Sequence, residues 1–216
     1  MENILKILWV GFVSVLYLPA HSASFSLAPY ASINSTKSVL SNSDGSETDK
    51  RQQRITYGIR ANITFFSIMR FQLGVGQSET KDTFKNQNVT DEFGKIDLKK
   101  ELNISTDDPD NEVEITETQR KGRVSLILDP SFSIFVLRAR VGVQATQRLF
   151  KKVATGETEE DFEGPIEFAP TAGGGFGIKF TPKIFMIAEY VFHFYEFPEL
   201  EPFERELAVS LNVSIP

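Results

Sequence analysis

The residue best suited to proton transfer in this chain is His193. Histidine titrates near neutral pH, and the second histidine, His21, lies in an apolar leader segment. A hydrolase or acyltransferase would need the imidazole of His193 beside a nucleophilic serine and an acid. Glu189 shares a predicted strand face with His193 but lies roughly 13 Å along that strand, which contains no serine. We therefore predict no catalytic residue and no enzymatic activity.

Metal binding would need clustered ligands, and the sequence offers one weak set. The chain has no Cys and a single His outside the leader, which argues against a zinc site. A short acidic stretch supplies hard oxygen ligands of the kind that calcium prefers: Asp107, Asp108, Asp110 and Glu112. The stretch lacks the glycine and the terminal Glu spacing of an EF-hand loop, so a solvated acidic loop is the simpler interpretation. We expect no cofactor.

A larger set of charged residues recurs at alternate positions of several segments. It comprises Arg54, Arg60, Arg70, Arg123, Arg138 and Arg140, together with Glu167, Glu189, Glu204, Glu206 and His193. Arg–carboxylate pairs keep charge stable away from bulk water, because each guanidinium can bind a carboxylate with two hydrogen bonds. We predict that these residues pair inside a lumen. The alternative is that they form a solvated outer face.

The segments that carry these charges alternate apolar and polar residues with a period of two, which is typical of strands with two unlike faces. The pattern covers residues 25–34, 54–65, 69–78, 121–129, 134–148, 166–180, 184–196 and 204–215. Short connections at about 66–68, 129–131 and 181–183 alternate with longer ones at about 35–53, 79–120, 149–165 and 197–203. This order predicts an all-β fold: an eight-stranded antiparallel up-and-down barrel.

Alternation alone does not say which face of the barrel points inward. A soluble, lipocalin-like barrel has its apolar face inside, whereas a transmembrane barrel has it outside, toward lipid. Glycines such as Gly58, Gly74, Gly142 and Gly175 gather on the polar face. Small residues suit a crowded interior and would weaken a solvated strand. Each apolar face also continues for five or six alternate residues, enough for a lipid-facing band of about 25 Å. The pattern favours the transmembrane barrel.

Composition agrees with this interpretation once it is divided between the faces. The 216-residue chain has a net charge of -6, which argues against nucleic-acid binding. Its mean hydropathy of -0.17 averages an apolar face, a polar face and acidic connections. Nine of the 19 Phe fall on the predicted apolar face. Residues 1–23 combine Lys6, an apolar run and small residues after Pro19, so we predict a cleaved signal peptide followed by a barrel over residues 24–216.

Over residues 24–216 the sequence resembles the small outer-membrane β-barrels of Gram-negative bacteria, the OmpA/OmpX-like group. The resemblance lies in the signal peptide, the eight two-faced strands and the alternation of turns and loops, and not in a residue motif. It implies an outer-membrane location and a scaffold with a plugged lumen. The chain departs from the group at its end, because Ile215-Pro216 stand where such barrels usually have an aromatic residue.

The leading functional prediction is a structural or surface-interaction role, through membrane integrity or loop-mediated adhesion or recognition. Expected partners are outer-membrane lipid and lipopolysaccharide, and a surface ligand or host protein bound by the loops. We expect a monomer that does not bind nucleic acid. Three alternatives remain open from the sequence: a narrow, porin-like pore or carrier of a small hydrophobic ligand, a lipid A-modifying barrel enzyme, and a secreted lipocalin-like binder.

Overall fold

The structure is a computed structural model that describes residues 24–41, 47–65, 68–85, 98–102, 104, 112–153, 160–194 and 204–215. The predicted signal peptide therefore lies outside the described residues. Among the described residues, no helix is both long and apolar enough to cross a membrane. The helix that is described, α2 (Leu98–Glu101), is a single turn between two strands.

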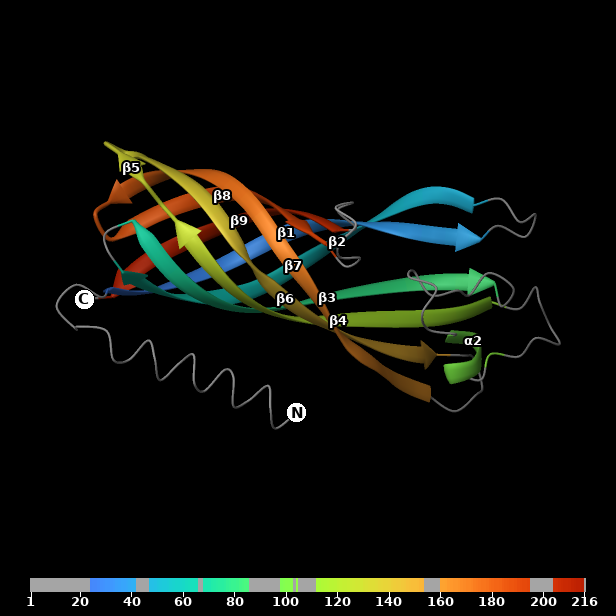
Figure 1. Cartoon of the computed structure of the whole chain (residues 1–216). Helices are drawn as coiled ribbons and strands as arrows, with labels where there is room; N and C mark the ends of the chain where they lie inside the picture. The colour runs from blue at the N-terminus through green and yellow to red at the C-terminus, as the bar shows by residue number, and fades with distance from the viewer. Residues whose placement is uncertain are drawn as a thin grey trace.

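Eight long antiparallel strands in the described part of the chain form one closed barrel (Figure 1). They are β1 (Ser24–Ser41), β2 (Glu47–Phe65), β3 (Met69–Lys85), β4 (Glu112–Leu128), β6 (Phe135–Val153), β7 (Glu160–Thr181), β8 (Ile184–His193) and β9 (Glu204–Ile215). The short β5 (Ser131–Phe132) lies in the turn between β4 and β6. Neighbours run in the order β4-β3-β2-β1-β9-β8-β7-β6, and pairing of β4 with β6 closes the ring. The predicted fold class is confirmed.

The two faces of the barrel have the polarity of a transmembrane barrel. Along β2, Ile59 is 47% exposed whereas the next residue, Arg60, is 1% exposed. Exposed and buried residues alternate along the other long strands too, and the buried ones are mostly polar except on β8, where Phe185, Ile187 and Val191 face inward. Exposed apolar side chains include Phe25, Ile33, Tyr57, Val75, Leu126, Val141, Phe176, Met186 and Leu211. Buried polar side chains include Asn34, Asn62, Gln72, Arg123, Arg140, Gln144, Glu189, Glu206 and Asn212. A lipocalin-like barrel would have the reverse arrangement, so that alternative is wrong.

Several strands are longer than the sequence predicts. The expected connections at 35–53, 79–120 and 149–165 begin and end in strand, because β1 and β2 pair as far as Ser41 and Glu47, and β3 and β4 as far as Lys85 and Glu112. Residues 47–53 of β2 are all polar and residues 79–85 of β3 contain one apolar side chain, so a search for hydrophobic alternation misses them. Backbone hydrogen bonds hold them all the same, with cross-strand pairs such as Lys81–Glu114 at 2.8 Å. One strand is shorter than the sequence predicts: β8 ends at His193, whereas the alternating segment runs from 184 to 196.

Glycines on the inner face let neighbouring strands curve closely around a narrow interior. A Cβ added to Gly142 on β6 would collide with the backbone carbonyl of Val124 on β4 and lie 2.6 Å from the Oγ of Ser125. The ring of Tyr30 on β1 lies over Gly58 and Gly76, so a Cβ at Gly58 would come within 2.5 Å of it. The sequence therefore places small residues where the barrel has least room.

Candidate functional site: the charged barrel interior

The middle of the interior is organised around one carboxylate, that of Glu189 on β8. It faces three guanidinium groups from two other strands. Arg60 on β2 forms an ion pair with its Oε1, Arg140 on β6 lies 3.0 Å from the same oxygen, and Arg138 on β6 lies 3.8 Å from Oε2. All four side chains are at most 1% exposed. Strand alternation directs each of these side chains into the lumen, and closure of the barrel brings the four together.

A second carboxylate, Glu206 on β9, joins further strands to this cluster. Arg123 on β4 forms an ion pair with Glu206, and Arg60 lies 3.3 Å from its Oε1. The Nε2 of His193 lies 3.2 Å from its Oε2. Arg123 also donates a 2.5 Å hydrogen bond to the side-chain carbonyl of Gln144. The contacts of Arg60 with both carboxylates make the two centres one continuous network across the lumen.

Toward the end of the barrel with the short turns, the interior contains both ion pairs and apolar side chains. There Arg138 donates two hydrogen bonds of 2.8 and 2.7 Å to the carboxylate of Asp129, and Arg70 lies 3.3 Å from the same group. The guanidinium of Arg70 also lies 4.7 Å above the ring of Phe185. Phe185 belongs to a buried apolar cluster with Val136 and Ile187. This end of the lumen is therefore lined by apolar side chains beneath an ion-pair layer.

Toward the end with the long connections, the interior again holds paired charges. The Nζ of Lys121 lies 2.6 Å from the Oε1 of Glu204, which also accepts a 2.5 Å hydrogen bond from Asn34. The carboxylate of Glu117 lies 2.5 Å from Arg54 and 3.8 Å from Arg148. The Lys121–Glu204 pair crosses the lumen from β4 to β9, whereas Asn34–Glu204 and Arg148–Glu117 join neighbouring strands.

The structure places nearly all the predicted charged residues in the interior, with some partners that the sequence did not indicate. Glu167 is half-buried, and its Oε2 has no hydrogen-bond partner among the described residues. Glu117, Asp129 and Lys121 were missed as members of the set. Glu117 lies in a segment predicted as a connection, and Asp129 was interpreted as a turn residue. Extending the strand alternation through β4 would have found Glu117.

Among the described residues, the side chains that the enzymatic and metal-binding alternatives would need do not lie together. His193 contacts Glu206 and not Glu189, and no serine hydroxyl is among its described partners. Within the described residues, no group of three or more His, Asp or Glu lies close enough to hold a metal ion. The calcium candidates Asp107, Asp108 and Asp110 lie outside the described residues, and Glu112 begins β4.

Beyond the barrel, four strands continue as a sheet that we call the extension: residues 79–85 of β3, 112–120 of β4, 147–153 of β6 and 160–169 of β7. Pairing of β3 with β2 stops at Ser78, and pairing of β7 with β8 stops at Thr171. The extension has its own core, in which Leu102 and Ile104 contact strand residues. The strand members of that core are Val113, Ile115, Phe150 and Phe162. The extension is therefore an ordered part of the fold (Figure 1).

Comparison with known proteins identifies the fold. No family model and no curated protein sequence matches this chain. A major outer membrane protein from Thermus thermophilus superposes with a TM-score of 0.50 at 10% identity, covering 90% of this chain and 100% of that chain. Neisserial surface protein A gives a TM-score of 0.49 at 13% identity, covering 90% and 99%.

The attachment invasion locus protein Ail of Yersinia pestis, solved with the heparin analogue sucrose octasulfate, gives a TM-score of 0.47 at 10% identity, covering 89% and 97%. At these identities the likeness concerns the fold alone. Together with the polarity of the two faces, the likeness to the Thermus thermophilus protein identifies the fold of this chain as an eight-stranded transmembrane β-barrel.

Proposed function

We propose that this protein is an outer-membrane β-barrel with a closed lumen, whose role is structural or lies in surface interactions. The observation that carries the proposal is the extension, because an ordered sheet with its own apolar core stands beyond the lipid-facing band. Transmembrane barrels place their longer connections outside the cell and their short turns in the periplasm. The extension then stands on the extracellular side, where a surface ligand or host protein can reach it.

The unpaired edges of the extension suit a solvent-exposed sheet. The β3 edge carries charged residues such as Glu79 and Lys81, and the β7 edge carries Pro165. Charge and proline on an edge strand hinder uncontrolled pairing with other chains. In this proposal the barrel is a monomer without catalytic activity, its outer face contacts membrane lipid and lipopolysaccharide, and recognition takes place at the extension and its connections.

Two features support a closed lumen. Ion pairs centred on Glu189 and Glu206 cross the interior between strands on opposite sides. Beneath them lies the apolar cluster of Val136, Phe185 and Ile187. An eight-stranded barrel has an interior that side chains can fill. Ions would have to disrupt both layers to cross.

A closed lumen predicts that the barrel does not conduct ions. Purified, folded barrel added to planar lipid bilayers should produce no discrete conductance steps at moderate voltage. Heat-modifiable migration in detergent gels should confirm that the same sample is folded, and a known porin in the same bilayer set-up should conduct. Reproducible steps that scale with the amount of folded protein would favour the narrow-pore alternative instead.

The surface position of the extension is testable because the chain contains no Cys. A Glu79→Cys variant, with a new thiol at an exposed position of the extension, should react with a bulky, membrane-impermeant maleimide on intact cells. A Lys183→Cys variant, in the exposed turn between β7 and β8, should react only after the outer membrane is permeabilised. The reverse pattern would contradict the proposed orientation, and labelling of neither variant on intact cells would contradict surface exposure.

A further inference from the structure

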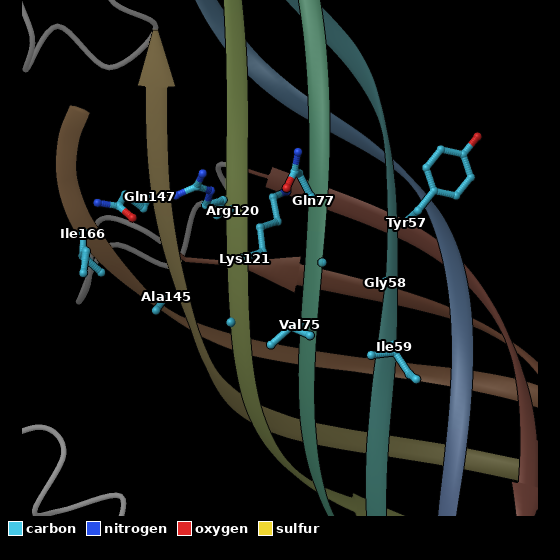
Figure 2. Close-up of a pocket in the computed structure, with 12 residues that line it drawn as sticks. Tyr57, Gly58, Ile59, Val75, Gln77, Arg120, Lys121, Ala145, Gln147 and Ile166 are labelled. Carbon is cyan, nitrogen blue, oxygen red and sulfur yellow. The ribbon is translucent and has the colours of Figure 1, made fainter. Parts of the chain in front are cut away.

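A groove of about 620 Å³ runs across the outer face of the barrel, over β2, β3, β4, β6 and β7 (Figure 2). Its floor is an apolar row of residues paired across the strands, Ile59, Val75, Gly122 and Ala145. Two residues further along each strand, where the extension begins, the register places a polar row, Gln77, Arg120 and Gln147, between Tyr57 and Ile166. The groove therefore lies where the apolar band gives way to polar residues.

Gly122 is the residue of this floor that has no side chain to fill the groove. Its neighbours Lys121 and Arg123 are buried, so position 122 faces outward. A Cβ added there would meet no atom within 4 Å, whereas a Cβ added to the inward-facing Gly142 would collide with the next strand. Strand curvature therefore does not require a glycine at this position. An outward glycine weakens a strand and marks a place where a ligand can approach the backbone closely.

Arg120 supplies a positive charge at the end of the groove nearest the extension. Its side chain is exposed, and no described acidic residue forms an ion pair with it. Its cross-strand partners are the neutral Gln77 and Gln147. The nearest acidic position in the register is Glu79, which lies diagonally to Arg120 because its own cross-strand neighbour is Thr118. Guanidinium and amide groups in this arrangement can donate several hydrogen bonds to one phosphate.

We propose that this groove binds a phosphate-bearing, anionic lipid of the leaflet on the side of the extension. One acyl chain lies over Gly122 between Val75 and Ala145, and the phosphate is bound by Arg120 with Gln77 and Gln147. The groove opens on the lipid-facing surface, so lipid is the molecule that fills it. The free guanidinium favours a lipid with net negative charge over a zwitterionic one. The inference rests on the membrane-spanning fold and not on the proposed surface role.

The test measures lipid retained by the full barrel after reconstitution in nanodiscs that contain lipid A and phosphatidylcholine, followed by detergent extraction and mass spectrometry. The measured quantity is the ratio of retained lipid A to retained phosphatidylcholine. This ratio should be about tenfold higher for the wild-type protein than for Arg120→Gln, because the substitution removes a hydrogen bond from a charged group. Gly122→Leu should lose the preference as well, because its side chain occupies the groove. The matched control is Arg205→Gln, which removes another arginine at the end of the apolar band, on β9.

Retention of the wild-type lipid preference by Arg120→Gln or by Gly122→Leu would overturn the inference. An equal loss in Arg205→Gln would overturn it too, because the preference would then reflect general attraction to surface charge. Heat-modifiable migration checks the fold of every variant. Normal migration with no lipid preference therefore contradicts this site alone and leaves the barrel and its surface role intact.

Discussion

Replacing Glu189 with glutamine should destabilise the barrel by about 3–5 kcal/mol, the usual cost of removing one partner from a buried ion pair. Glutamine has nearly the same shape, so the change removes charge and little packing. The carboxylate of Glu189 lies against Arg60, Arg138 and Arg140, all at most 1% exposed. Buried cations already outnumber buried carboxylates among the described residues. The variant leaves guanidinium groups facing one another without compensation.

The matched control is Glu114→Gln in the extension. Glu114 lies 2.8 Å from Lys81, but the two side chains are 32% and 60% exposed. Exposed ion pairs contribute little because water screens them, so this change should alter stability by less than about 1 kcal/mol. Urea unfolding in detergent micelles, followed by circular dichroism and by heat-modifiable migration, measures both variants. Equal effects of the two substitutions would show that the Glu189 cluster does not stabilise the barrel.

Gly142→Ala is expected to destabilise the barrel by about 1–3 kcal/mol or more, as overpacking does in a close-packed interior. The new methyl group would collide with the carbonyl of Val124 and lie 2.9 Å from the Cα of Ser125. Both are backbone atoms of the neighbouring β4, so no side-chain rotation relieves the clash. β4 and β6 would have to separate at the seam that closes the ring.

The same substitution at Gly122 is the control, because it lies on β4 in the same sheet but faces outward. No atom lies within 4 Å of the added Cβ. Replacing glycine by alanine at a permissive position stabilises a protein by about 0.4–1 kcal/mol, through the unfolded state. Gly122→Ala should therefore fold as well as the wild type. A Gly142→Ala barrel with unchanged urea stability would contradict the close approach of β4 and β6.

The orientation of the two faces, apolar outside and polar inside, could be inferred from the sequence because charged residues and glycines occur on the same face. Inward positions carry both the charged residues and the glycines, for example Arg60 with Gly58 on β2. Charge would suit a solvated face equally well, but glycine would not. The structure shows the reason: at Gly58 a Cβ would contact the ring of Tyr30, so the small residue is required by the narrow interior.

The glycine run at 173–175 shows where such reasoning reaches its limit. A glycine run inside an alternating strand predicts that another group approaches the backbone closely, but not which group it is. In the structure, Gly173 and Gly175 face β8, whose backbone carbonyls at Tyr190 and Ala188 would lie 2.5 Å from an added Cβ. At Gly58 and Gly76 the approaching group is the ring of Tyr30. Composition predicts that something approaches closely, whereas strand register determines what it is.

The sequence by itself determined the class of fold, which face of each strand points inward, and which residues make up most of the charged interior. Those properties follow from a period of two and from residue chemistry, which are local. The tertiary structure alone decided which charges pair, how far the strands extend and where the outer groove lies. Arg60 contacts Glu189 and Glu206, which are 129 and 146 positions away along the chain. Such contacts depend on ring closure and register, because barrel curvature, and not sequence distance, brings facing strands together.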